Sequence, residues 1–244
     1  EADECQIYTD VDGVFTTDPR TFSKARLLKN VSFEEMLELS SSGAKVLQLR
    51  AVEYASKFNL PLRVLSSFND GEGTLVQEEE NIMERPVVSG ISSTDSEAKL
   101  TIRGVPDLPG VAAKILSPIS EEGIEVDVIV QNISAENNTD FTFTVDKSDA
   151  ARAEEILKET SQSLGGGSIE VDSDIAKISI VGRGMRAHAG VASKMFLALA
   201  KSEINISMIT TSEIKISVVI KRNEMIKAVQ TLHDAFDLDK ELDS

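Results

Sequence analysis

The chain has 244 residues, which is enough for between one and two average domains. Its 41 acidic residues outnumber 25 basic ones, so the net charge is -16, which argues against nucleic acid or an anionic membrane as a partner. Cys5 is the only cysteine, which excludes an intramolecular disulfide and a cysteine-rich zinc site and favours a cytoplasmic location. No apolar run approaches the roughly 20 residues that a membrane-spanning helix needs.

The chain begins without a methionine and runs almost directly into a strand-like segment, so we expect it to be part of a longer gene product. The first eighty residues predict a short series of α/β elements. Two strands and two helices leave faces that need more sheet, so this segment should be one flank of a larger α/β unit. The predicted elements are a strand at 5–8, a polar loop at 9–20, helices at 32–41 and 45–58, and a strand at 62–65.

An internal repeat organises the rest of the chain. The segment Ala98-Lys-Leu-Thr-Ile102 recurs as Ala176-Lys-Ile-Ser-Ile180, and Gly110-Val-Ala-Ala-Lys114 recurs as Gly190-Val-Ala-Ser-Lys194. The spacing between the copies widens by two residues across the intervening loop, so the copies differ mainly in that loop.

Each copy predicts a strand, a loop, a helix, two strands joined by a turn, and a second helix. In the first copy the strands alternate apolar and polar residues, as half-buried antiparallel strands do, and the helices cover one face. A βαββαβ order gives a ferredoxin-like sandwich. The predicted fold class is α+β, with two such units after the α/β segment. The first copy should place strands at 98–103, 125–134 and 140–146 and helices at 111–122 and 148–160.

The second copy lacks an obvious closing strand after its last helix at 223–236. The β-branched run at 87–91 is available to complete that sheet, which would nest the first copy inside the second. The expected domains are therefore 1–80, 98–172, and 86–95 together with 173–240.

The segment Gly182-Arg-Gly-Met-Arg-Ala187 superficially matches a dinucleotide-binding fingerprint. We reject this reading because the following helix should begin near Gly190, so a pyrophosphate would miss the helix N-terminus. The equivalent loop of the first copy, Gly104 to Gly110, lacks the pattern as well.

Both loops share a glycine at the start of a helix, where backbone N–H groups could bind the carboxylate of an amino acid. Asp107 could pair with its ammonium group, and Gln131 and Asn132 could hydrogen-bond its other polar atoms. The alternative is that Asp107 is a turn or cap residue and Gln131 an edge-strand side chain. The polar run Thr210-Thr-Ser-Glu213 ends the matching strand of the second copy, which favours ligand binding.

His188 lies in the second loop, and a lone histidine is more often a structural hydrogen-bonding residue than a catalytic one. No second histidine, cysteine or carboxylate pair has metal or triad spacing with it, so we expect no metal site. Asp10, Asp12 and Gly13 lack the remaining ligands of a calcium loop, and a strand-end loop of this kind would instead suit a nucleotide.

Several of these strings together resemble the aspartate kinases, and the resemblance covers essentially the whole chain. They are Tyr8-Thr-Asp-Val-Asp-Gly-Val-Phe-Thr-Thr-Asp-Pro-Arg20, Gly43-Ala-Lys-Val-Leu47, Val130-Gln-Asn-Ile133, Thr139-Asp-Phe-Thr-Phe-Thr144 and Thr211-Ser-Glu-Ile214. The resemblance implies the C-terminal part of an amino-acid-kinase domain followed by two ACT domains, the second interrupted by the first.

In that family ATP, with Mg²⁺, phosphorylates L-aspartate to 4-phospho-L-aspartate, the first step of lysine, threonine and methionine biosynthesis. The resemblance implies ATP contacts at Thr9, Asp10, Asp18, Arg20 and Lys45. It does not complete a catalytic set within this chain, so we expect the chain alone to be inactive.

The resemblance also implies feedback inhibition by threonine, lysine or both. The positions implied for threonine are Asp107, Gly110, Val111, Ala112, Gln131 and Asn132, with Asn205 and Ile206. Those implied for lysine are Met185, His188, Gly190, Val191, Ser212 and Glu213. Partners should be these small effectors and either a second copy, bound through the ACT domains, or the rest of the kinase.

The leading hypothesis is therefore a regulatory fragment of aspartate kinase. One alternative is that the chain combines with the rest of the kinase domain and is active. Another is a ferredoxin-like RNA-binding module, which should show exposed aromatic residues on its sheets and basic flanks.

Overall fold

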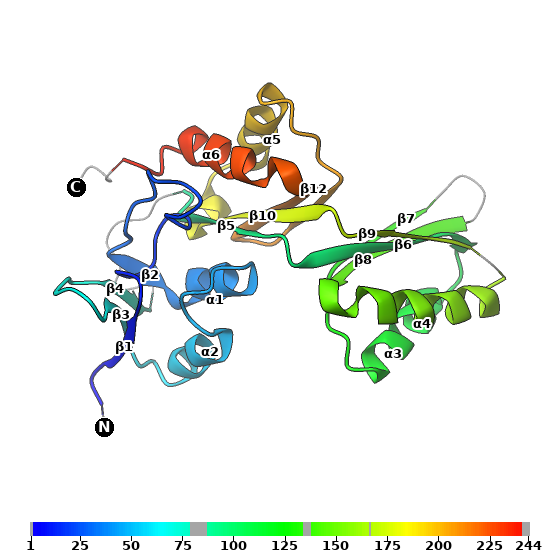
Figure 1. Ribbon diagram of the computed structural model, residues 1–244, viewed down its shortest axis with the longest axis horizontal. Helices are drawn as coiled ribbons and strands as arrows, with labels where there is room; N and C mark the ends of the chain where they lie inside the picture. Colours follow the sequence, from blue (N-terminus) through cyan, green and yellow to red (C-terminus); the bar gives the residue numbers. More distant parts are fainter. Residues whose placement is uncertain (1, 79–86, 134–137, 166, 241–244) are drawn as a thin grey trace. The chain divides into compact units, whose positions relative to one another are not determined.

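The computed structural model describes residues 2–78, 87–133, 138–165 and 167–240. The chain forms two compact units, which are described separately. Unit 1 combines residues 1–94 with 177–244, and unit 2 spans residues 95–176. Figure 1 shows three sheets, each accompanied by helices.

The first sheet of unit 1 has four strands in the order β1-β3-β4-β2. β1 (Cys5–Thr9) and β3 (Leu62–Ser66) are parallel, and both were predicted. The prediction of only two strands is wrong, because β2 (Asn30–Ser32) pairs in parallel with β4 (Thr74–Gln77).

Two helices accompany this sheet, α1 (Phe33–Ser41) and α2 (Leu49–Lys57). α1 begins with a capping box, in which Ser32 and Glu35 bond each other's backbone N–H groups. The helix expected from residue 45 begins only at Leu49, because Gln48 has an extended backbone, and Leu47 is buried in the same core as Met36 and Val52.

Unit 2 contains β6 (Glu97–Pro106), α3 (Val111–Glu121), β7 (Val126–Ile133), β8 (Asn138–Asp146), α4 (Ala150–Ser163) and β9 (Ser168–Asp172). The strand order is β7-β8-β6-β9, and all neighbours are antiparallel. This arrangement confirms the predicted ferredoxin-like fold.

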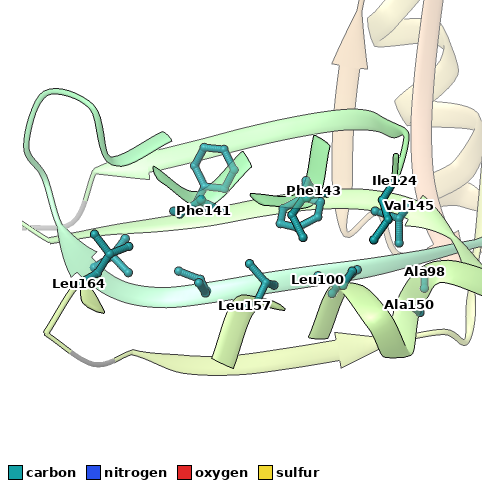
Figure 2. Packing of buried hydrophobic residues seen from close by; sticks show 14 of the residues in the cluster. Ala98, Leu100, Ile124, Phe141, Phe143, Val145, Ala150, Leu157 and Leu164 are labelled. Carbon is teal, nitrogen blue, oxygen red and sulfur yellow. The ribbon is translucent and has the colours of Figure 1, made fainter. Parts of the chain in front are cut away.

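The core of unit 2 lies between the sheet and its helices. Figure 2 shows Phe141, Phe143 and Leu100 of the strands in one cluster with Leu157 and Ala150 of α4. Val111, Ile115 and Ile119 form the buried stripe of α3, as their helical spacing predicts.

The second sheet of unit 1 repeats this plan in the order β11-β12-β10-β5. Its fourth strand comes from before the first copy, since β5 pairs antiparallel with β10 and begins at Gly90, three residues after the expected start. In Figure 1, α5 and α6 lie together on one side of this sheet. The elements are β5 (Gly90–Thr94), β10 (Ile175–Val181), α5 (Val191–Lys201), β11 (Met208–Thr211), β12 (Lys215–Lys221) and α6 (Met225–Ala235).

Candidate functional site

The two repeated loops end in the same way. Gly110 and Gly190 cap α3 and α5 in left-handed conformations, with φ of 92° and 94°, and a Cβ at either position would meet open space. Glycine is therefore required by the backbone angle and leaves the helix start accessible. The expectation of free N–H groups is wrong at Val111, whose N–H donates to the Leu108 carbonyl at 3.2 Å.

The first loop and the end of β7 carry the positions that the resemblance implies for threonine. Asp107, Gln131 and Asn132 are all exposed. Asn132 lies opposite Asp140 in the strand register, and its carbonyl accepts a hydrogen bond from the Thr139 hydroxyl at 2.9 Å. Within unit 2, Gly110, Val111 and Ala112 start α3, whereas Asn205 and Ile206 belong to unit 1 and precede β11.

The second loop carries the positions implied for lysine. Met185 lies in a 3₁₀ turn, η3 (Arg183–Ala187), and Gly190 and Val191 start α5. Ser212 and Glu213 are exposed between β11 and β12. The His188 ring Nδ1 donates to the Gly184 carbonyl at 2.7 Å, so this histidine is hydrogen-bonded within its own loop.

The predicted helix start near Gly190 is confirmed, because Gly184 lies inside η3 and α5 begins only at Val191. Gly182 has a packing role instead. A Cβ there would lie 2.5 Å from the Val87 carbonyl oxygen and 2.6 Å from Val88 Cα. The glycine thus permits close approach of two backbone segments.

Helix α1 presents a buried carboxylate to this loop. The side chain of Glu35 accepts hydrogen bonds from the Ser32 N–H at 3.2 Å, the Ser89 hydroxyl at 2.5 Å and the Arg183 N–H at 3.1 Å. Buried carboxylates are stable only when their oxygens are satisfied in this way. Glu35 therefore joins the start of α1, the segment before β5 and η3.

Further acidic residues of α1 form ion pairs with the second copy. Arg183 and Arg186 bind Glu34 at 2.6 Å each, and Lys215 binds Glu38 at 2.7 Å. Sequence analysis missed all of these contacts. The Ser32-to-Glu35 spacing would have revealed the capping box, but not its partners in the second copy.

A second contact within unit 1 joins α6 to the polar loop. His233 is fully buried, its Nε2 lies 2.8 Å from the Thr16 hydroxyl, and its ring meets Phe22 edge to face. Burial lowers the pKa of His233, partly offset by Asp239 and Asp234. Sequence analysis also missed this residue.

Four of the five residues expected to contact ATP lie in the predicted polar loop at 9–20, and Lys45 lies between α1 and α2. Thr9 ends β1, and its hydroxyl accepts a hydrogen bond from the Val11 N–H at 3.1 Å. Arg20 forms an ion pair with Asp18 at 2.9 Å, which lowers the pKa of the Asp18 carboxyl and raises the pKa of Arg20. Asp10 and Lys45 are exposed.

Arg20 and Lys45 are exposed cations, the type of side chain that binds phosphate oxygens, so the residues present fit part of an ATP site. They do not form a complete cradle, because Asp18 already binds the Arg20 guanidinium. In the described parts of the chain, no three histidine, cysteine or acidic side chains are grouped as metal ligands. None of the described helices is both long and apolar enough to cross a bilayer.

The exposed aromatic residues Tyr8, Tyr54, Phe58 and Phe68 belong to the first seventy residues and not to the ferredoxin-like sheets. Over the described residues, those sheets thus lack the stacking surface that the RNA-binding alternative requires.

Comparison with known proteins gives matches to two family models. The ACT domain model matches residues 100–160 and 178–236, and the amino acid kinase family model matches residues 1–66. The chain is 61% identical over 241 residues to an aspartokinase of Pseudomonas aeruginosa, covering 98% of this chain and 58% of that relative. The chain thus spans little more than half the length of the relative.

Solved structures agree with this match. An aspartate kinase of Clostridium acetobutylicum has a TM-score of 0.84 at 26% identity, over 96% of this chain and 55% of that one. Aspartokinase III of E. coli in complex with lysine and aspartate, described as the T-state, has a TM-score of 0.79 at 26% identity, over 96% and 52%. The chain belongs to the aspartate kinase family, of which it contains the end of the amino acid kinase domain and two ACT domains.

Proposed function

We propose that this chain is the regulatory part of an aspartate kinase and that its ACT domains bind threonine, lysine or both as feedback effectors. The observation that carries this proposal is the repeated pairing of a glycine-capped helix start with an exposed polar strand end or turn. Helix starts attract carboxylates, and exposed amide and carboxylate side chains suit an ammonium group.

We assign threonine to the loop and strand end of unit 2, with Asp107 as the partner of its ammonium group. Gln131 and Asn132 would then bind its remaining polar atoms. We assign lysine to the second loop, with Glu213 and Ser212 as polar partners and Met185 beside its aliphatic stem. The related E. coli enzyme was solved in complex with lysine, which supports lysine as an effector.

Calorimetric titration of the chain with threonine, with lysine and with both tests the proposal. Threonine binding should weaken at least tenfold in Asp107→Asn and stay unchanged in Asp149→Asn, a matched change at the start of α4. Lysine binding should weaken similarly in Glu213→Gln and stay unchanged in Glu53→Gln on α2. Absence of heat and of thermal stabilisation with either amino acid would overturn the effector assignment.

We further propose domain limits of 1–80, 98–172, and 86–95 with 173–240, and a cytoplasmic homodimer formed through the ACT domains. The pairing of β5 with β10 supports joining residues 86–95 to 173–240 in one domain.

The proposed dimer is supported by the edge strands β7 and β11, on which Ile129 and Ile209 are 49% and 45% exposed. Light scattering after size-exclusion chromatography measures the oligomeric state.

The match of residues 1–66 to the amino acid kinase model favours a second candidate function. Combined with the rest of that domain, the chain would take part in the phosphorylation of aspartate, with Thr9, Asp10, Asp18, Arg20 and Lys45 beside ATP. ATP would supply the transferred phosphoryl group, and Mg²⁺ would be held largely by its phosphates and water. Aspartate-dependent ADP release by the chain alone would contradict the purely regulatory proposal.

A further inference from the structure

Six charged side chains gather where α1 meets the second loop, and we call them the α1 ion cluster. Three carboxylates face three cations. The members are Glu34 and Glu38 of α1, Arg183 and Arg186 of η3, Glu213 of the β11–β12 turn, and Lys215 at the start of β12.

Arg186 is shared between two carboxylates of this cluster. Its Nη2 lies 2.6 Å from Glu34 Oε1 and 2.9 Å from Glu213 Oε2. The other oxygen of Glu34 is bound by Arg183 at 2.6 Å. Glu34 is therefore fixed in place by a second cation, whereas among the described contacts of Glu213 the Arg186 guanidinium is the only cation.

The two partners of Arg186 differ in how easily a ligand reaches them. The Glu213 side chain is 78% exposed and that of Glu34 is 38% exposed. Further contacts join α1 to the β11–β12 turn and the start of β12. The Ser212 hydroxyl donates to Glu38 at 3.4 Å, and Lys215 binds Glu38. Residues proposed to bind lysine thus adjoin residues that hold α1.

We propose that Arg186 is a positioning residue that couples effector binding to α1, an inference that rests on the proposed lysine site. An ammonium group of lysine binds Glu213 and takes the place of the Arg186 guanidinium. Arg186 then pairs with Glu34 alone. Because exposed ion pairs are weak and easily exchanged, a small ligand can drive this change.

The inference predicts opposite effects for two substitutions in one ion pair. Arg186→Gln removes the competitor at Glu213, so lysine should bind about 3- to 10-fold more tightly. Glu34→Gln removes the alternative partner of Arg186, so lysine should bind about 3- to 10-fold more weakly. A purely structural ion pair would give the same direction of change for both.

General electrostatics would also give opposite signs, and a double-mutant cycle separates the two explanations. If Glu34 acts through Arg186, the Arg186→Gln/Glu34→Gln double variant should bind lysine as Arg186→Gln does. Independent electrostatic effects would add and return the double variant to the wild-type affinity.

The test is calorimetric titration of lysine into the full chain and its three variants, with Arg152→Gln as the control. Arg152 is also a surface arginine, paired with Asp149 at 3.1 Å in unit 2, so its variant should bind like the wild type. Additive changes, or changes of one sign, overturn the inference and leave the lysine site intact. Absence of lysine binding by the wild type overturns both the site and the inference.

Discussion

The outer faces of the two ferredoxin-like sheets carry matching positions in different surroundings. In unit 2, Arg103 on β6 is half-exposed and pairs with Glu170 at 2.8 Å and Asp140 at 3.3 Å. On β10 the corresponding region is fully buried, and Val181 joins the core that contains Met36 and Leu39 of α1.

A pair of hydroxyls repeats the contrast. Thr101 and Thr142 hydrogen-bond at 3.0 Å in unit 2, and Ser179 and Ser217 do so at 2.7 Å in unit 1. Both serines are buried and bond each other, whereas in the threonine pair Thr101 is buried and Thr142 is partly exposed. One sheet plan thus serves a polar outer face in unit 2 and a face covered by the end of the kinase domain in unit 1.

Matched core truncations should give the largest effects and separate the units. Ile115 on α3 and Met195 on α5 are both fully buried at equivalent positions. Ile115→Ala should destabilise unit 2, and Met195→Ala unit 1, each by about 2–5 kcal/mol because each leaves a cavity. Hydrogen exchange followed by mass spectrometry measures the two units separately. Uniform loss of protection across both units in either variant would show that they do not unfold independently.

A glycine substitution tests the covering of the unit 1 sheet by the segment after α1. Gly43 has φ of 113°, and a Cβ would lie 2.8 Å from the Ser93 carbonyl oxygen on β5. Gly43→Ala should therefore destabilise unit 1 by about 2–4 kcal/mol, measured by denaturant unfolding.

Gly110→Ala is the matched control in unit 2. Its φ is also positive, but a Cβ there has open space, so only the backbone strain of about 1–2 kcal/mol applies. Equal losses in the two variants would argue against close packing at Gly43.

The buried carboxylate of Glu35 should contribute more to the free energy of unfolding than the partly exposed carboxylate of Glu34. Glu35→Gln places an NH2 donor opposite either the Arg183 N–H, at Oε1, or the Ser32 N–H, at Oε2, and should cost about 1–3 kcal/mol. Glu34→Gln breaks partly exposed ion pairs and should cost at most about 1 kcal/mol. Denaturant unfolding compares them, and a larger loss in Glu34→Gln would contradict the buried network.

The smallest effect should be a pH dependence confined to unit 1. Burial lowers the pKa of His233 below its usual value of 6.5, so the unfolded chain binds the proton more tightly. Neutral His233 therefore stabilises unit 1 fully above about pH 6.5, and this stability is lost as the pH falls below 6.5. The charges that act on this ring are Asp234, Asp239, Lys24 and Arg26.

Unit 2 contains no histidine, so its exchange protection should change little between pH 7 and pH 5.5. His233→Gln should flatten the response of unit 1 over the same range. A pH response that persists in this variant would assign the titration to another group.

The repeat allowed the ferredoxin-like fold to be predicted from sequence, because alternating strands and the Val111, Ile115 and Ile119 stripe have clear periodicities. β2 and β4 were missed, since three or four residues are too few to show alternation and their pairing joins distant segments.

The candidate effector residues could be named from motifs, but the α1 ion cluster could not. Arg186 and Glu34 are 152 positions apart, and surface charges have no periodicity that predicts such a contact. His233 was missed for a similar reason, because its partner Thr16 lies 217 positions away.

Hydrogen exchange of the chain with and without lysine tests most directly whether the second loop senses an effector and passes the signal to α1. We predict that lysine changes exchange at 183–191 and 211–214 and also along α1 at 33–41, and that Arg186→Gln abolishes the change in α1 only. Altered exchange in the loops with no change in α1 of the wild-type chain would contradict the account.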